Sequence, residues 1–289
     1  MKLTKGEKAF NAVNACLLAV IAIVTIYPLI YVLSASLSSS TAFMQGKVLL
    51  WPVDFTFAAY EKVLSQSNIW IAYANTIYYT VFGTLVSMAI TIAGAYPLSK
   101  KYLPGGRVIS RLVVFTMWFN PGIIPFYLTL KGYGLLDTRT AIILAFAVNT
   151  FNVILMRNFF QSVPDALEEA ARIDGANDLK ILFRIFLPLS LPAIATVALF
   201  YAVSRWNGYF WAMVIFQSDS KIPLQVLLKK LIVEATNRAQ YDTVDASIQY
   251  SSETIIYATI VVSIIPMLIV YPYIQKYFVK GVMVGAVKE

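Results

Sequence analysis

The sequence contains no histidine and only one cysteine, Cys16. Histidine-based acid–base catalysis and HExxH zinc sites are therefore excluded. One cysteine can form neither an internal disulfide nor a cysteine-rich metal site. The nucleotide-binding patterns GxxxxGK and GxGxxG are absent as well. We therefore expect no catalytic residue, no metal site and no cofactor on this chain, and any ATP that the protein uses must bind to a separate chain.

Charged residues are also scarce. Only 13% of the 289 residues are charged, whereas 59% are hydrophobic, and the mean hydropathy is +0.69. Soluble domains have about 25% charged and about 45–50% apolar residues. The composition therefore indicates an integral membrane protein. The net charge of +8 suits anionic lipid headgroups, and no nucleic-acid partner is needed to explain it.

Long apolar stretches lie between the few charged residues. A helix needs about 20 apolar residues to cross the bilayer core. Backbone polar groups must be hydrogen-bonded internally in lipid, which favours helices over strands here. The sequence thus predicts an all-α membrane protein with six transmembrane helices, over residues 12–33, 72–97, 112–130, 140–157, 189–217 and 254–275.

Lysine and arginine are spread unevenly over the segments between these spans. If the N-terminus is cytoplasmic, the inner segments hold more of them than the outer segments, as the positive-inside rule requires. We therefore expect both termini in the cytoplasm and a single transmembrane domain over residues 1–289. The first apolar stretch is too long for the core of a signal peptide, so we expect it to be retained.

The segment at 162–188, between the fourth and fifth spans, predicts two short helices joined by a glycine turn. Pro164 and Asp165 suit a first helical turn. Gly175 tolerates the left-handed backbone that ends a helix, and Asn177 is suited to cap the next helix, with Phe183 and Phe186 on its apolar side. Composition alone also allows a simple amphipathic helix lying on the headgroups.

The order of residues in this segment points to a family. Glu169-Ala-Ala, Asp174-Gly175-Ala176, Phe183, Ile185 and Leu187-Pro188 follow one another in a single register. This segment closely resembles the EAA loop of bacterial ABC importer permeases. A wider resemblance is to the maltose-permease-like branch of carbohydrate importers, in the subgroup for oligosaccharides, alginate and aldouronates. It is carried by Pro28-Leu-Ile-Tyr31, Ile124-Pro125-Phe-Tyr127, Gly134-Leu-Leu-Asp-Thr138 and the tail at 278–287.

The resemblance implies an ABC type I importer permease in the bacterial inner membrane. Its expected partners are a second, non-identical permease, two cytoplasmic ATPase subunits that bind ATP and Mg²⁺, and an extracytoplasmic sugar-binding protein. The loop at 162–188 would be the coupling helix that docks on the ATPase. The residues implied in docking and in anchoring the loop are Glu168, Glu169, Ala170, Ala171, Asp174, Gly175, Phe183 and Pro188.

A sugar path needs polar groups and aromatic faces inside the membrane domain. The best candidate segment runs from Arg205 to Trp211 in the fifth span, and within it we single out Arg205, Trp206, Asn207 and Tyr209. A charge at such depth usually faces a cavity or a partner, so Arg205 is a candidate to bind a sugar carboxylate. The alternative is an arginine that extends to the membrane interface.

Three asparagines in other spans are further candidates for the sugar path. Asn120 precedes Pro121 and Gly122, and broken helices often line transporter cavities. Asn149 and Asn152 are three residues apart and share a helix face, where they are equally suited to hold helices together.

The sequence therefore predicts a non-enzymatic membrane subunit of an ATP-driven importer for an oligo- or polysaccharide, with acidic sugars such as alginate or uronate oligomers as candidates. The alternative is a stand-alone secondary carrier for a small polar solute. Such carriers usually hold ionisable residues in their spans. Here only Arg205 lies inside a span, whereas Arg157 stands at the end of one.

Overall fold

The computed structural model describes residues 4–241 and 252–286, and within these ranges the chain forms helices and no strand. It divides into two compact units. The first comprises Met1–Trp70 and Leu228–Ile265, and the second comprises Ile71–Leu227 and Pro266–Glu289. The predicted all-helical class is confirmed.

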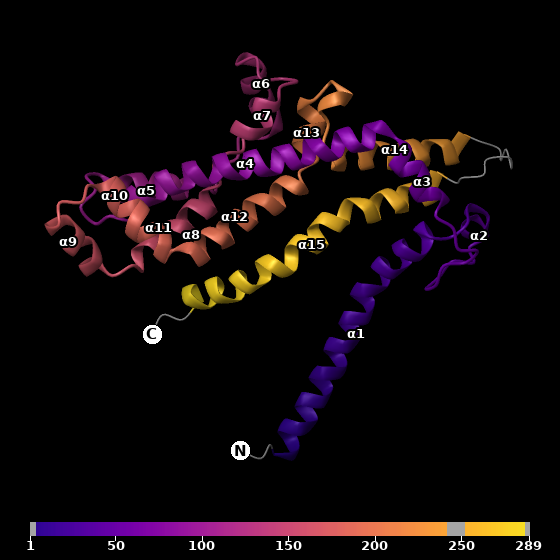
Figure 1. Cartoon of the computed structure of the whole chain (residues 1–289), viewed down its shortest axis with the longest axis horizontal. Helices are drawn as coiled ribbons and strands as arrows, with labels where there is room; N and C mark the ends of the chain where they lie inside the picture. Colours follow the sequence, from indigo (N-terminus) through magenta and orange to yellow (C-terminus); the bar gives the residue numbers. More distant parts are fainter. Residues whose placement is uncertain (1–3, 242–251, 287–289) are drawn as a thin grey trace. The chain divides into compact units, whose positions relative to one another are not determined.

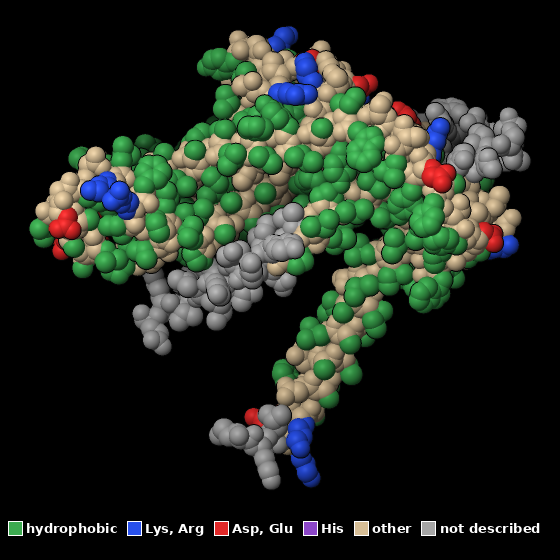
Figure 2. Space-filling model, viewed as in Figure 1, with side chains coloured by type: hydrophobic (Ala, Val, Ile, Leu, Met, Phe, Trp, Pro, Cys, Tyr) green, Lys and Arg blue, Asp and Glu red, His purple; other side chains and the backbone are tan. Residues whose placement is uncertain are grey.

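The first unit contains α1 (Lys5–Ser36), α2 (Ser40–Met44) and α3 (Ala58–Ser65). Thr4 and Glu7 form a reciprocal capping box at the start of α1. This arrangement satisfies two backbone donors that no helical carbonyl reaches. The apolar central part of α1 buries none of its residues within the structure, and exposed hydrophobic side chains are spread along its visible surface (Figure 2). Such a surface is typical of a helix in contact with lipid or with another membrane protein.

The second unit is built around α4 (Ser67–Ser99), which runs through it from end to end (Figure 1). The helices that follow in this unit are α5 (Gly106–Phe115), α6 (Ile123–Gly132), α7 (Arg139–Leu144), α8 (Thr150–Gln161), α9 (Asp165–Ile173), α10 (Asp178–Ile181), the π-helix η1 (Leu182–Phe186), α11 (Leu187–Leu189), α12 (Leu191–Trp206), α13 (Phe210–Ile215) and the 3₁₀ turn η2 (Asp219–Lys221). Three of the described helices continue from one unit into the other: α4, whose first four residues belong to the first unit, α14 (Leu224–Tyr241) and α15 (Ser252–Ala286).

The core of the second unit joins α4, α8, η1 and α12. At its centre the rings of Tyr96, Phe160 and Phe186 meet edge to face, with centroids 5.2–6.1 Å apart. Met156 and Val197 are completely buried beside them. Aromatic rings in this geometry add to the stabilisation that burial alone provides, so this cluster fixes the helices on either side of the 162–188 loop.

Three predicted spans are not continuous helices, which corrects the expectations for 112–130, 140–157 and 189–217. The first breaks between α5 and α6, where Pro121 lacks a backbone donor and Gly122 adopts φ +85°. The second breaks before α8, because the Asn149 side chain caps the new helix at the Asn152 amide. The third breaks at Asn207-Gly208, between α12 and α13.

Two helices in the described residues are long and apolar enough to cross a membrane, α1 and α4. A third span results if the segments Asp178–Leu189 and Leu191–Asn207, which meet at 83°, are taken together. These helices contain the predicted spans 12–33 and 72–97, and part of the fifth span. The shorter apolar helix at Glu253–Ile269 overlaps the first part of the sixth predicted span, 254–275.

Candidate functional site

A cavity of about 660 Å³ lies in the second unit between α4, α7, α8, α12 and α13. It brings together five of the predicted path residues: Asn149, Asn152, Arg205, Asn207 and Tyr209. Its wall also contains Phe210 and Trp211 from the same candidate segment. Five further aromatic side chains come from outside that segment and were not predicted: Tyr79, Phe146, Phe151, Phe200 and Tyr201. None of its lining residues is acidic. The cavity therefore combines amide groups and aromatic faces, the chemistry that recognises a sugar ring.

Two predicted path residues lie outside this cavity. Trp206 is buried, only 6% exposed, and its ring meets Tyr73 edge to face at 6.1 Å. Asn120 is in the break between α5 and α6, where its side-chain oxygen accepts a hydrogen bond from the Gly122 amide at 2.9 Å. Their observed contacts hold the local backbone and packing and do not reach the cavity.

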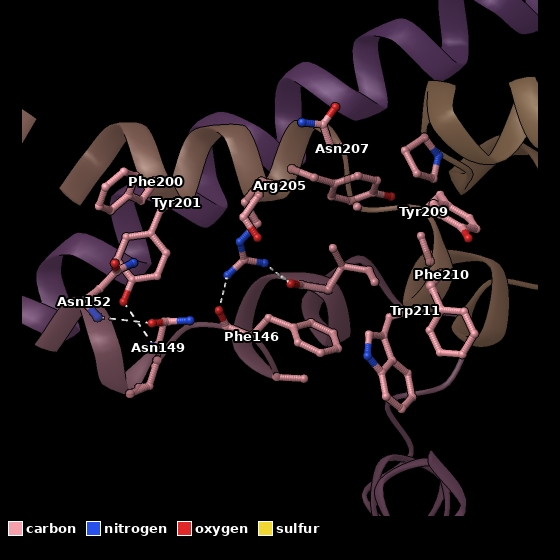
Figure 3. A pocket seen from close by; sticks show the side chains of 18 of the residues that line it. Phe146, Asn149, Asn152, Phe200, Tyr201, Arg205, Asn207, Tyr209, Phe210 and Trp211 are labelled. Atoms are coloured by element: carbon pink, nitrogen blue, oxygen red, sulfur yellow. Dashed lines mark hydrogen bonds between the residues drawn. The ribbon is translucent and has the colours of Figure 1, made fainter. Parts of the chain in front are cut away.

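Arg205 points into the break between α7 and α8 (Figure 3). Its guanidinium donates to the carbonyl oxygens of Ile142, of Ile143 at 3.1 Å and of Phe146 at 2.7 Å. It also donates to the Ser87 hydroxyl of α4 at 3.1 Å. The side chain thus does not extend to an interface. It supplies donors to carbonyls that the broken helix leaves without an intrahelical partner.

The contacts of Arg205 depend on close approach to α4 at Gly83. A Cβ atom placed on Gly83 would lie 3.0 Å from Nε and 3.1 Å from Cζ of Arg205. No such obstacle exists at Gly94, further along the same helix, where no atom lies within 4 Å of a Cβ. Only a residue without a side chain leaves room for the Arg205 guanidinium at position 83.

This pair of glycines gives a matched prediction. Replacing glycine by alanine inside a helix usually favours the helix by about 1 kcal/mol. We expect Gly94→Ala to leave the melting temperature of the purified protein unchanged or to raise it. We expect Gly83→Ala to lower it, because the clash with Arg205 outweighs the gain in helix propensity. Equal increases in both variants would show that Arg205 does not pack on Gly83.

The polar residues on the opposite side of the cavity are fixed by their neighbours (Figure 3). The Tyr201 hydroxyl accepts a hydrogen bond from the Asn149 amide at 3.1 Å and lies 2.7 Å from the Thr91 hydroxyl. The Asn149 side chain caps α8 through the Asn152 amide at 3.1 Å. The side-chain oxygen of Asn149 therefore orders the start of α8.

Trp211 provides the largest aromatic face of the cavity. Its ring lies 4.7 Å from Phe126 of α6 and 5.8 Å from Phe146, centroid to centroid. Phe126 and Phe146 are themselves 5.5 Å apart. These contacts hold α13 beside α6 and α7 and fix the orientation of the indole. No signal in the sequence could have found this cluster, because its members come from three separate apolar segments.

A hydrogen-bond network around Asp137 borders one end of the cavity, at Tyr79 and Pro223. The Asp137 carboxylate accepts hydrogen bonds from Lys221 Nζ at 2.7 Å, from the Ser218 hydroxyl at 2.6 Å and from the Gln217 amide at 3.1 Å. The bonds from Lys221 and Ser218 hold the pKa of Asp137 well below its usual range. The Tyr79 hydroxyl donates to the Lys221 carbonyl at 2.7 Å. These bonds tie the segment after α13 to α4 and to the loop before α7.

The predicted coupling loop has the expected local structure. Gly175 ends α9 with φ +76°, and the Asn177 side chain caps α10 at the Lys180 amide at 2.9 Å. Both expectations for this turn are confirmed. The turn exposes Ile173, which is 86% accessible, together with Glu169, Ala170, Asp174 and Gly175. Ala171 is half-buried.

Glu168 and Phe183 differ from the sequence-based picture. Glu168 is buried, 8% exposed, and forms an ion pair with Lys100, so it does not belong to the exposed surface of the loop. Phe183 is 64% exposed, whereas Phe186 packs in the core. The reason is the π-helix at Leu182–Phe186, whose wider turn changes which side chains share a face. Phe186 therefore anchors the loop and Phe183 does not. Pro188 is exposed just before the bend into α12.

Comparison with known proteins identifies the class of this chain. The family model of the binding-protein-dependent transport system inner membrane component matches residues 88–284. The chain belongs to this family. The matched range includes the loop at 162–188 and every lining residue of the cavity except Tyr79. The side chains of the tail motif at 278–287 lie outside the described residues.

Three relatives show how close the likeness is. The permease is 43% identical over 283 residues to the polygalacturonan/rhamnogalacturonan transport system permease protein YtcP of Bacillus subtilis, covering 98% of this chain and 99% of that one. It is 39% identical to protein LplC of the same species, covering 99% and 97%. It is 49% identical to a chain in the crystal structure of a bacterial ABC transporter involved in the import of the acidic polysaccharide alginate, with a TM-score of 0.89 and coverage of 96% and 99%.

These findings confirm the resemblance noted in the loop. The permease is an inner membrane component of an ABC transporter of the sugar-uptake class, and its all-helical fold is the type I importer permease fold. The family consists of transport subunits and not of enzymes.

Proposed function

We propose that this permease translocates an acidic oligo- or polysaccharide into the cytoplasm by alternating access. The observation that carries the proposal is its full-length likeness to one permease named for polygalacturonan/rhamnogalacturonan transport and to a chain of an alginate importer. Both of those substrates are built largely from sugar acids. The cavity supports the same substrate class, because it offers aromatic faces and amides with no acidic lining residue.

The charge of Arg205 is part of this argument. The structure gives it carbonyl and hydroxyl partners but no carboxylate within the described residues. A positive charge without a counter-ion in a medium of low dielectric raises the local potential. A sugar carboxylate that enters the cavity is therefore stabilised by this charge even though the guanidinium donors are bonded to the protein.

The topology and assembly proposed for the permease follow the family. In the proposed topology the chain has six spans, and both termini are in the cytoplasm. It pairs with a second, non-identical permease, two cytoplasmic ATPase subunits that bind ATP and Mg²⁺, and an extracytoplasmic sugar-binding protein. The exposed tip around Ile173 and Gly175 is the part of the loop that docks on an ATPase subunit. Closure of the ATPases then moves the loop and turns the cavity outward.

An uptake experiment tests the proposal. The complete complex would be purified from its native host and reconstituted in vesicles together with the companion proteins that mass spectrometry identifies. We expect uptake of oligogalacturonate or alginate oligomers that requires ATP and the binding protein, and far less uptake of neutral maltooligosaccharides. Uptake driven by a proton or sodium gradient without ATP, by this chain alone, would instead establish the secondary carrier.

A further inference from the structure

Lys100, the first residue after α4, lies beneath the coupling loop. Its Nζ atom is 2.6 Å from Oε2 of Glu168 in α9, and the two side chains are only 6% and 10% exposed. Figure 1 shows α9 and α10 at the same end of the second unit as the last turn of α4. The chain thus places a buried ion pair between two segments that are 68 residues apart in sequence.

The surroundings of this ion pair leave neither charge without partners. The Lys100 ammonium lies 3.6 Å from the ring centroid of Phe186 and 4.3 Å from that of Tyr96. Such cation–π contacts are strongest where water is excluded. The second carboxylate oxygen of Glu168 accepts hydrogen bonds from the Tyr102 hydroxyl at 3.1 Å and from Arg172 at 3.0 Å.

Burial and pairing act on the pKa values of both groups. Burial lowers the pKa of Lys100, while its contact with Glu168 opposes that change. Burial acts to raise the pKa of Glu168, but hydrogen bonds from Lys100 and Arg172 outweigh it and hold that pKa below its ordinary value. A buried pair of this kind resists separation, because removal of one partner leaves an uncompensated charge.

We propose that Lys100 and Glu168 form a brace through which the coupling loop moves α4 together with the helices that flank the loop. Both are positioning residues, since neither touches the sugar cavity or the exposed tip of the loop. The inference rests on the proposed function. Helix α4 contributes Gly83 and Ser87, which contact Arg205, and Tyr79, which lines the cavity. A rigid link between the loop and α4 therefore connects the docking surface to the cavity wall.

The chain provides its own control pair. Lys101 and Asp165 join the same two segments with a 2.8 Å contact, but their side chains are 86% and 67% exposed. Exposed ion pairs contribute little because water screens them. The two pairs therefore differ in burial while linking the same parts of the molecule.

The first test compares isosteric substitutions in the complete reconstituted complex. Lys100→Met and Glu168→Gln are measured against Lys101→Met and Asp165→Asn, with Lys100→Arg as the variant that keeps the charge. The measured quantity is the amount of sugar imported per ATP hydrolysed. We expect this ratio to fall about tenfold in the buried-pair variants, within the usual range of couplings between sites. We expect it to stay near the wild-type value in the control pair and to recover in part with Lys100→Arg.

The possible results separate the brace from the proposed function. Equal ratios in the Lys100→Met and Lys101→Met complexes, with normal ATP-dependent import by the wild type, would overturn the brace and leave the function standing. Absence of ATP-dependent import by the wild-type complex would overturn both.

A second test does not depend on the stability of the Lys100 variants. Lys101→Cys and Asp165→Cys are introduced together with Cys16→Ser, and the two thiols are joined by a short bifunctional reagent that contains a disulfide. A rigid brace predicts that the cross-linked complex still imports sugar. Loss of import on cross-linking and its return on reduction would show that the loop separates from α4 during the cycle, and would overturn the proposal.

Discussion

Replacing Arg205 by methionine should unfold the cavity wall and abolish import of every sugar, acidic or neutral. The guanidinium is the donor for three carbonyls at the α7–α8 break and for Ser87. A buried polar group left without its partner costs about 1–3 kcal/mol. Loss of these bonds therefore destabilises the permease by several kcal/mol, which is a large part of the stability of a typical domain.

Thermal unfolding of the purified complex measures this effect directly. Arg184→Met makes the same chemical change at an exposed residue and should leave the melting temperature nearly unchanged. Arg205→Lys should recover little, because a single ammonium cannot match the planar set of donors that reaches several acceptors at once. An Arg205→Met complex that melts like the wild type and loses only acidic sugars would show instead that Arg205 acts on the substrate alone and does not stabilise the cavity wall.

The second large effect is expected at the tip of the coupling loop. Gly175 has φ +76° and open space around it, so an arginine there strains the backbone and projects from the surface proposed to meet the ATPase. We expect Gly175→Arg to weaken retention of the ATPase subunits on the order of thirtyfold, as for the loss of about 2 kcal/mol at the centre of an interface. Co-purification at graded detergent and salt concentrations measures the retention.

A second glycine separates backbone strain from docking. Gly105 has φ +70°, also with open space around it, and lies in the turn before α5. Gly105→Arg introduces the same strain and the same charge away from the loop tip. We expect this variant to keep its ATPase subunits. If both variants lose them equally, strain or charge explains the loss and the loop tip is not the docking surface.

Local signals in the sequence were sufficient where one residue decides the structure. The left-handed turn at Gly175 and the cap at Asn177 follow from side-chain chemistry within a few residues, and both were predicted. The broken helices were harder to predict. The Asn120-Pro121-Gly122 segment indicated one break. The other break, before α8, depends on the end of α7 and on the hydrogen bonds with which Arg205 stabilises that end. Hydropathy cannot reveal such a break, since both halves are apolar.

The cavity and the Lys100–Glu168 brace could be identified only from the three-dimensional structure. Arg205 was singled out for its charge, yet its partners Ile142 and Ser87 lie 63 and 118 residues away in sequence. Glu168 stands next to Glu169 and looks equivalent to it in the sequence. Only the packing of α9 on the end of α4 buries one and exposes the other. Long-range contacts of this kind leave no periodic pattern for a single sequence to show.

The bend before α12 determines how a force on the loop reaches the cavity. The segments Asp178–Leu189 and Leu191–Asn207 meet at 83°, so a push along the first has almost no component along the second. It acts instead as a torque about Ser190. Points on a lever move in proportion to their distance from the pivot, and Arg205 lies about 22 Å along α12 from Ser190. Under the proposed transport mechanism, α12 would therefore swing sideways and would not slide along its axis, with its largest displacement at Arg205, which bonds the cavity wall.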